Sequence, residues 1–314
     1  MVPALIGYIA AEISKTSFRS TNALGNLVYA AVLPFRNSGL DSEERISAPS
    51  ANLKEVDQMY DKFASQYDYF VNWKSRLAFE MPFIQEQLSR LSDAPERLKV
   101  LDAACGTGQH AIALARLGYD VSGADLFPQM LSLANTNALA ADVNITFKAA
   151  GFGSIAAVFP AERFQAVLCL GNSLPHVKSK TELQQALADF AAVTAPGGLL
   201  LLQQRNFDAV MRAKNRFMEP QTHSTGEQER VFFRFYDFEP QGLIQLNILT
   251  LTRKPGSSWE SAMTSTTLFP ILHAELQGAL AEAGFVDLCF YGNMKGEEFN
   301  LSTSGDLIVV ARRQ

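Results

Sequence analysis

The chain has 314 residues, of which 47% are hydrophobic, so it can bury the core of one large domain or of a domain with additions. Its 27 basic and 32 acidic residues give a formal net charge of −5 without a long basic run, which disfavours a nucleic acid substrate. The three cysteines share no metal-like spacing and the four histidines are scattered. The sequence therefore predicts a cytoplasmic protein in a reducing compartment, with no metal site.

The first 50 residues differ from the rest of the chain. Residues 1–39 contain a single acid, Glu12, and their apolar pieces are shorter than the roughly 18 residues that span a bilayer. Two interpretations stay open for this segment: organelle targeting by residues 1–40, or an arm, helical in parts, that packs on the domain or on a second subunit. Residues 41–53 have the composition of a polar linker. We therefore divide the chain into an extension, residues 1–53, and a folded domain, residues 54–314.

Residues 54–90 have a helical pattern. Tyr60, Phe63, Tyr67 and Phe70 recur at steps of three and four residues, which predicts one buried face along a helix.

Residues 98–131 form the unit on which the rest of the prediction depends. An apolar strand over 98–101 ends in Asp102, a turn of small residues follows, and a helix over 109–117 leads to a second strand that ends in Asp125. Gly106 and Gly108 allow the backbone to approach a ligand closely, and the helix start offers N–H groups to an anion. Asp125 is placed to accept hydrogen bonds from a ribose diol. The pattern indicates a Rossmann-like cofactor site; a ligand-free Rossmann turn and a nicotinamide site are the alternatives.

The order strand, Asp102, two residues and then Cys-Gly-Thr-Gly resembles motif I of the class I S-adenosylmethionine (SAM) methyltransferases. The resemblance implies an α/β fold with a doubly wound, Rossmann-like, seven-stranded sheet. It also implies that the glycine loop backs the amino acid end of SAM and that Asp125 holds its ribose. The family usually has an acid near the adenine where this chain has Gly151 and Phe152, so backbone groups are expected to edge the ring there.

Three further tracts resemble the glycine/sarcosine N-methyltransferases. The piece YDYFVNWKSRLAFEMPFIQEQL resembles their lid, in which an arginine, here Arg76, reaches the carboxylate of SAM; an exposed helix arginine is the alternative. The stretch from Gly171 to His176 matches their GNS-x-x-H tract, so Asn172 is expected to orient the acceptor amine. His176 either accepts a proton or orders the loop. Arg205, in the tract QRNFD, is expected to bind the acceptor carboxylate. The alternative is an internal salt bridge, for example with Asp208 or Asp237.

The site residues that follow from the pattern and the resemblance form two groups. The candidate catalytic residues are Asn172, His176 and Arg205. The candidate cofactor-binding residues are Tyr67, Trp73, Arg76, Asp102, Ala104, Gly106, Gly108, Asp125, Leu126, Met130, Gly151, Phe152, Leu170, Asn172 and Ser173. The chain departs from the family pattern at Gly151, Gln204, Phe207 and Phe269, and at least two of these positions are expected to contact the acceptor.

The remaining elements follow from periodicity and turn residues. Helices are expected over 131–141, 181–194 (with Thr181 as N-cap) and 270–283. Strands are expected over 144–149, 199–203, 266–269, 285–291 and 307–311, and a further strand is expected to begin at residue 164. Residues 195–198 are expected to form a turn. Residues 212–262 are expected to form a capping insertion of antiparallel strands, since Ile244, Leu246 and Ile248 alternate with polar residues.

These features predict a SAM-dependent methyltransferase that releases S-adenosyl-L-homocysteine. The expected acceptor is a small molecule, the amine of glycine, sarcosine or a similar carboxylate-bearing compound. The alternatives are O- or N-methylation of a larger natural product or carboxylic acid metabolite, and a SAM-binding protein without catalysis. An RNA methyltransferase is disfavoured by the acidic balance. We expect no nucleic acid partner and no transmembrane segment; the extra arm suggests a homo-oligomer.

Overall fold

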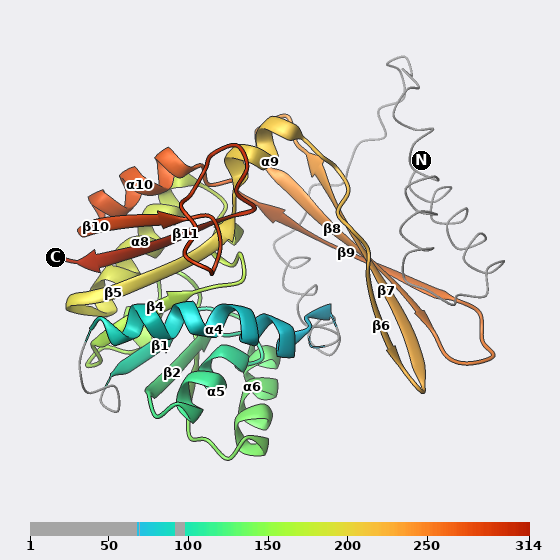
Figure 1. Ribbon diagram of the computed structural model, residues 1–314, viewed down its shortest axis with the longest axis horizontal. Helices are drawn as coiled ribbons and strands as arrows, with labels where there is room; N and C mark the ends of the chain where they lie inside the picture. The colour runs from blue at the N-terminus through green and yellow to red at the C-terminus, as the bar shows by residue number, and fades with distance from the viewer. Residues whose placement is uncertain (1–67, 69, 92–97) are drawn as a thin grey trace.

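The computed structural model describes residues 68, 70–91 and 98–314. The expectations for the extension, for the linker and for Tyr67 lie outside these residues. Within the described part, a seven-stranded sheet carries helices on both faces and a smaller antiparallel sheet extends from one side of it (Figure 1). The predicted α/β class is confirmed.

The seven-stranded sheet has the order β3-β2-β1-β4-β5-β11-β10. Its strands are β1 (Lys99–Asp102), β2 (Asp120–Asp125), β3 (Thr146–Ala149), β4 (Phe164–Cys169), β5 (Thr194–Arg205), β10 (Phe285–Tyr291) and β11 (Asp306–Arg313). Neighbouring strands from β3 to β5 are parallel, whereas β11 runs antiparallel to both β5 and β10. The carboxyl ends of β1, β2, β4 and β5 therefore meet at one edge, where ligands of such sheets bind.

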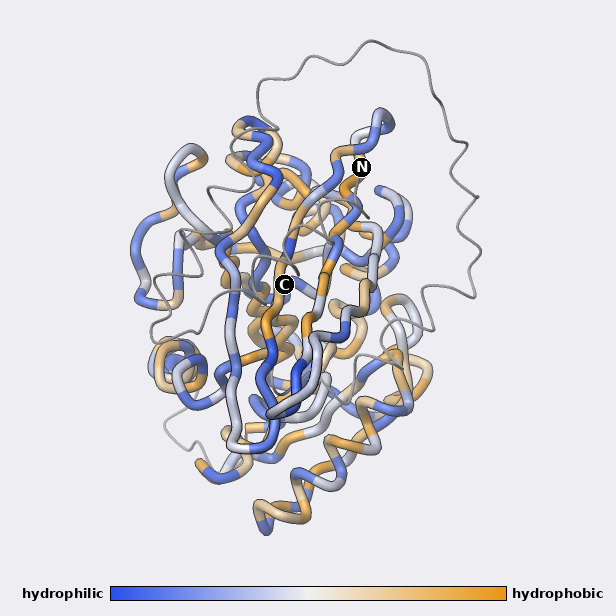
Figure 2. The backbone as a smooth tube through the Cα atoms, turned by 90° about the vertical axis from the view of Figure 1, so that its right-hand side faces the viewer, coloured by the Kyte–Doolittle hydropathy of each residue, from blue (hydrophilic) through white to orange (hydrophobic). Residues whose placement is uncertain are grey.

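The helices cover the two faces of this sheet because its strands are apolar on both sides. The helices of one face are α4 (Trp73–Ser89), α5 (Gln109–Arg116) and α6 (Pro128–Ala140); those of the other are α7 (Ile155–Val158), α8 (Lys180–Val193) and α10 (His273–Glu282). Leu199 and Leu201 pack on the α4 side, and Leu200 and Leu202 pack on the α8 side. Such continuous apolar runs are typical of strands buried on both faces. Figure 2 shows hydrophobic and hydrophilic residues alternating along the helices.

Three boundaries differ from the sequence predictions. The stretch at residues 71–72 is not helical, and α4 begins at Trp73 because the Asn72 side chain accepts a hydrogen bond from the Ser75 amide at 3.2 Å. Helix α8 begins at Lys180 with Ser179 as its N-cap, so the assignment of Thr181 was wrong. The turn expected at 195–198 lies within β5, where the register against β4 shifts.

The antiparallel sheet, which we call the capping sheet, follows β5 and the short helix α9 (Phe207–Ala213), which the sequence did not predict. Its order is β6-β7-β8-β9, with β6 (Gln221–Thr225), β7 (Gln228–Phe238), β8 (Ile244–Arg253) and β9 (Glu260–Leu268). The expected boundary at residue 262 falls inside β9, so residues 266–268 belong to the capping sheet and not to the core sheet. The Phe269 amide donates to the Pro175 carbonyl at 2.8 Å, which ties the end of β9 to the loop after β4.

Candidate active site

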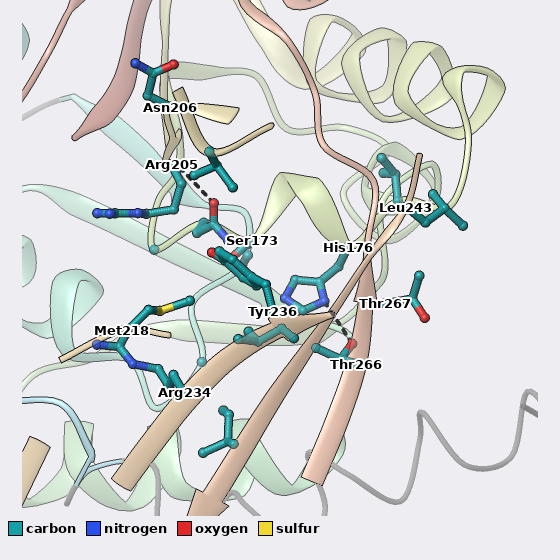
Figure 3. A pocket seen from close by; sticks show the side chains of 18 of the residues that line it. Ser173, His176, Arg205, Asn206, Met218, Arg234, Tyr236, Leu243, Thr266 and Thr267 are labelled. Atoms are coloured by element: carbon teal, nitrogen blue, oxygen red, sulfur yellow. Dashed lines mark hydrogen bonds between the residues drawn. The ribbon is translucent and has the colours of Figure 1, made fainter. Parts of the chain in front are cut away.

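A cavity of about 1520 Å³ lies between the carboxyl ends of the core strands and the capping sheet (Figure 3). Its volume exceeds the roughly 300–1,000 Å³ typical of single-ligand pockets, so it has room for a cofactor and an acceptor. The expected site residues that line it are Ala104, Gly106, Asp125, Leu126, Met130, Gly151, Phe152, Asn172, Ser173, His176 and Arg205. Of the other described candidates, Trp73, Arg76, Asp102, Gly108 and Leu170 are outside this lining.

The glycine loop after β1 is tied to the end of β2. The Gly106 amide donates to one carboxylate oxygen of Asp125 at 2.8 Å, and the Phe127 amide donates to the other at 3.0 Å. Gly106 and Gly108 have φ values of 53° and 81°, which disfavour residues with a side chain. A Cβ at Gly108 would also lie 3.1 Å from the Cβ of Ala134. The sequence needs glycine here for both conformation and close packing.

The polar groups of this loop fit SAM. Asp102 is buried at the end of β1, next in sequence to the lining residues Ala103 and Ala104, and its Oδ2 has no hydrogen-bond partner among the described residues. An ammonium group that reached this oxygen would supply the missing partner. Burial raises the pKa of Asp102 to about 6, so a cation beside it would favour the charged form. Each oxygen of Asp125 keeps a lone pair for a hydroxyl after accepting one backbone amide. Ammonium and ribose are the groups that SAM would present to these two acids.

The wall expected to edge the adenine is apolar. Met130 is buried in α6, and Leu126 is exposed in the loop before it. A Cβ at Gly151 would lie 3.1 Å from the Cδ1 of Leu126, so a larger residue there would narrow the cavity. Phe152 is fixed by an edge-on contact with Phe190, with ring centroids 5.5 Å apart. Leu170 differs from this group, since its side chain is part of the core and its carbonyl accepts the Ser173 hydroxyl at 2.8 Å.

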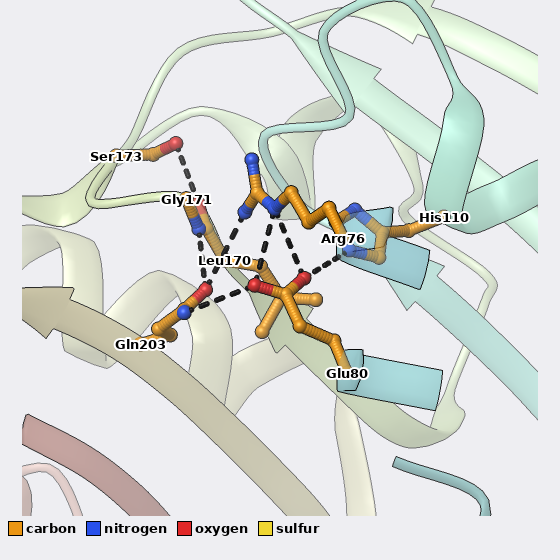
Figure 4. Close-up of polar contacts among 7 residues, drawn as sticks. All are labelled: Arg76, Glu80, His110, Leu170, Gly171, Ser173 and Gln203. Carbon is orange, nitrogen blue, oxygen red and sulfur yellow. Dashed lines mark hydrogen bonds and ion pairs between the residues drawn. The ribbon is translucent and has the colours of Figure 1, made fainter. Parts of the chain in front are cut away.

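Arg76 takes part in a buried polar network and is not an exposed helix arginine (Figure 4). Its Nε donates to both oxygens of Glu80 at 3.1 Å, and Glu80 also accepts from Gln203 at 3.1 Å. The Nε2 of His110 lies 2.6 Å from the same carboxylate. Burial alone raises the pKa of Glu80, but the hydrogen bond with His110 and the charge of Arg76 outweigh burial and lower it. Glu80 is therefore ionised at neutral pH and fixes the direction of the guanidinium.

The same network reaches the loop after β4. Gln203 accepts from the Gly171 amide at 3.0 Å, and the ideal Cβ position of Gly171 lies 3.2 Å from a guanidinium nitrogen of Arg76. Trp73 packs under this guanidinium, 5.1 Å from its centre, and donates to Asp68 at 2.8 Å. Asp68 also accepts from the Thr107 hydroxyl at 2.7 Å, which links the start of α4 to the glycine loop.

Asn172 is held in a left-handed conformation, with φ of 64°, directly after Gly171, with φ of 72°. Its side-chain oxygen accepts from the Arg205 amide at 2.8 Å. Asn172 lines the cavity, and its Nδ2 donates to no other described residue, so this nitrogen is a donor that a ligand can use.

His176 lies in the short 3₁₀ helix η3 (Leu174–His176), and Figure 3 shows it in the cavity. Its Nδ1 is 3.4 Å from the hydroxyl of Thr266 on β9. Burial lowers the pKa of His176 to about 4. The imidazole is therefore neutral at physiological pH and is a weak base.

Arg205, at the end of β5, forms an ion pair of 2.9 Å with Asp306. The two residues are register partners on β5 and β11, which explains the pairing. Neither of the aspartates suggested from the sequence is its partner: Asp208 accepts from the His273 amide, and Asp237 pairs with Arg216. Burial raises the pKa of Asp306, and the charge of Arg205 opposes this effect.

Three departures from the family pattern do not line the cavity. Gln204 is buried and donates to the Ile271 carbonyl at 2.7 Å. Phe207 is fully buried in a cluster with Tyr236, and Phe269 packs against the main core. The residues that differ from the family pattern at these three positions therefore act in packing. Of the four departures, only Gly151 lines the cavity.

Sequence reasoning missed Glu80, His110 and Gln203 as partners of Arg76, and Thr266 as a partner of His176. The spacing of Arg76 and Glu80 by four residues was a readable signal of an ion pair. Arg234 and Tyr236 line the cavity from β7, but strand periodicity alone does not say which face is covered. The part of the chain that the structure describes contains neither a metal-binding cluster nor a helix long and apolar enough to cross a bilayer.

Known proteins share both the sequence pattern and the fold. A family model described as a methyltransferase domain matches residues 100–198. A glycine/sarcosine N-methyltransferase from Aphanothece halophytica is 30% identical over 241 residues, 74% of this chain and 82% of that protein.

Solved structures match along most of the chain. A SAM-dependent methyltransferase from Clostridium acetobutylicum has a TM-score of 0.64 at 15% identity, covering 81% of this chain and 98% of that one. A SAM-bound amino pentose methyltransferase from Micromonospora echinaspora has a TM-score of 0.61 at 18% identity, covering 86% and 100%. At these identities the likeness concerns the fold.

The fold, the glycine loop and the two acids Asp102 and Asp125 are those of a Rossmann-like protein that binds a nucleoside-containing cofactor. Together with the relatives they show that this chain belongs to the SAM-dependent methyltransferases. Its cofactor is SAM, and the expected recognition of the family is confirmed.

Proposed function

We propose that this methyltransferase transfers a methyl group from SAM to the amine of glycine, sarcosine or a similar small carboxylate-bearing compound. The observation that carries the proposal is the coupling of Asn172 to Arg205 at the carboxyl ends of β4 and β5. One amide donor and one guanidinium, both on the cavity wall, match the two oxygens of a carboxylate. The glycine/sarcosine specificity of the relative from Aphanothece halophytica is consistent with this choice.

When bound, SAM supplies a methyl group already activated on a sulfonium. The residues of the chain then have to position an acceptor and exclude water. Asp102 and Asp125 would hold the amino acid end and the ribose, and Arg76, directed by Glu80, would face the cofactor carboxylate. Asn172 and Arg205 would fix the acceptor so that its nitrogen lone pair points along the line of transfer.

His176 acts in this scheme as a positioning group. A general base works best with a pKa near the operating pH, whereas the pKa of His176 is lowered to about 4. Its contact with Thr266 joins the loop after β4 to the capping sheet, so it orders the acceptor side of the cavity. The acceptor amine then loses its proton to solvent before it is methylated.

Methyl transfer to defined acceptors tests the proposal. The purified protein is incubated with SAM and with glycine, sarcosine, glycinamide or a primary amine without a carboxylate, and the products are identified by mass. We expect methylated glycine or sarcosine, and at least tenfold lower kcat/KM for glycinamide, because the amide lacks the charge that pairs with a guanidinium. Turnover of the two amines that lack a carboxylate at equal or greater efficiency would refute the carboxylate assignment.

A second candidate is N- or O-methylation of a larger metabolite. The cavity volume of about 1520 Å³ favours it, since glycine would fill only a small part of the space left by SAM. The amino pentose acceptor of the Micromonospora echinaspora structure is an example of such a substrate. The same assay with amino sugars in place of amino acids separates the two candidates.

A further inference from the structure

A half-buried arginine on the capping sheet, Arg234, lines the cavity. Arg234 and Tyr236 are two residues apart on β7, so their side chains share one face of the strand, and both line the cavity (Figure 3). The guanidinium of Arg234 lies over the ring of Phe70, 5.2 Å from its centroid. Phe70 is held in turn by an edge-on contact with Phe232 at 5.4 Å. Aromatic packing therefore positions this cation.

The charge of Arg234 is not balanced by a carboxylate within the described residues. Its buried Nε has no hydrogen-bond partner there, and it forms no ion pair. Burial, together with the charge of Arg205, lowers its pKa. Arg216 and Arg253, in contrast, pair with Asp237 and Glu229. Because a partly buried charge with an unpartnered Nε and no counter-ion is costly, an anionic ligand in this cavity would stabilise Arg234.

Arg205 is in a different position. Asp306 already neutralises it through the 2.9 Å ion pair, and half of its side chain is exposed. A carboxylate that approached Arg205 alone would meet a charge already paired. Arg205 and Arg234 are nevertheless close enough for their charges to interact, and Tyr236 interacts with both.

We propose that Arg234 is the main binding residue for the carboxylate of the acceptor, and that Asp306 attenuates Arg205 beside it. This inference rests on the function proposed above and deepens it, since Arg234 would select acceptors with an acidic group over amines without one. Arg234 then determines specificity from the capping sheet, whereas Asn172 and Arg205 act from the core sheet.

The test measures carboxylate binding separately from turnover. Protein saturated with S-adenosyl-L-homocysteine is titrated calorimetrically with glycine, sarcosine and acetate, and with the neutral isosteres glycinamide and acetamide. We expect the wild type to prefer the acids, and Arg234→Gln to weaken binding of the acids at least tenfold while the amides change little. Arg253→Gln is the matched control, because this arginine lies on the same sheet, is paired with Glu229 and does not line the cavity.

Two further variants separate recognition from folding. Arg234→Lys keeps the charge and is expected to retain part of the affinity for the acids. Adding Asp306→Asn to Arg234→Gln removes the counter-ion of Arg205, and this double variant is expected to regain part of the affinity for the acids as well. Unchanged acid affinity in Arg234→Gln, equal losses in the Gln and Lys variants, or no preference of the wild type for acids would each overturn the inference. The proposed function fails on another readout, the absence of methyl transfer to glycine and sarcosine by the wild type.

Discussion

Replacing Glu80 by glutamine should destabilise the protein and weaken cofactor binding together. The substitution keeps the size of the side chain and removes only its charge. Glu80 is 4% exposed and contacts Arg76, His110 and Gln203. In the variant, the guanidinium of Arg76 is left with no carboxylate partner in the network of Figure 4.

The magnitude follows from burial. Removing one partner of a buried ion pair costs about 3–5 kcal/mol, and the partial exposure of Arg76 places this pair near 3 kcal/mol. In a domain of this size each kcal/mol lowers the melting temperature by about 2–4 °C, so a loss of roughly 6–12 °C is expected. Affinity for S-adenosyl-L-homocysteine should fall about tenfold, because Arg76 loses the group that directs it.

The same helix provides the control. Glu86 and Arg90 also form an ion pair at a spacing of four residues, but their side chains are 59% and 52% exposed. Glu86→Gln should cost no more than about 0.5 kcal/mol. Thermal unfolding and calorimetric titration of both variants make the comparison. Equal shifts in melting temperature for the two variants would refute the burial argument.

The pH dependence gives an independent check of the same prediction. The pKa of Glu80 is lowered in the folded state, so the unfolded state binds its proton more readily. The stabilisation by Glu80 is therefore present above its unfolded pKa and is lost as the pH falls through its folded pKa. The difference in melting temperature between the wild type and Glu80→Gln should shrink in acid, and a difference that grew would contradict the assignment.

Three more substitutions test the site. Gly108→Ala should lower both stability and cofactor affinity, because a φ of 81° strains alanine and the new Cβ would lie 3.1 Å from the Cβ of Ala134. Gly118→Ala is the control: with φ of 92° and nothing within 4 Å, it should show the backbone strain alone. Asp125→Asn should weaken cofactor binding measured by calorimetry about tenfold, since hydrogen bonds to a charged group contribute about 1.5–3 kcal/mol. His176→Gln should slow methyl transfer without changing the pH profile of kcat/KM above pH 6, because the pKa of His176 is about 4. Loss of the ascending, acid-side limb of that profile would identify His176 as the base instead.

The cofactor end of the site was predictable because its residues are close in sequence. One strand, one turn and one helix bring Gly106 and Asp102 to the sheet edge, and the next strand adds Asp125. Each step depends on local rules of glycine conformation and strand order, which a sequence displays directly.

The acceptor end was less predictable because its contacts are distant in sequence. Arg205 and Asp306 are 101 positions apart, and their pairing depends on β11 lying antiparallel beside β5. Gln203 is 123 positions from Glu80, and its polarity in an apolar strand was the only hint. The face of the capping sheet that carries Arg234 follows from its register over the core, which alternation alone does not determine.

The charges of the cavity give a direction to the proposed reaction. Asp102 and Asp125 place negative charge at the cofactor end, where SAM would bring a sulfonium and an ammonium, whereas Glu80 is paired with Arg76. Arg234 places positive charge at the proposed acceptor end, whereas Asp306 pairs with Arg205 there. Under the proposed function, this gradient would orient a small acceptor with one amine and one carboxylate, with its nitrogen toward the methyl group and its carboxylate toward the capping sheet. An amine without a carboxylate gains no such orientation, so the charge pattern favours amino acid acceptors over amines that lack an acidic group.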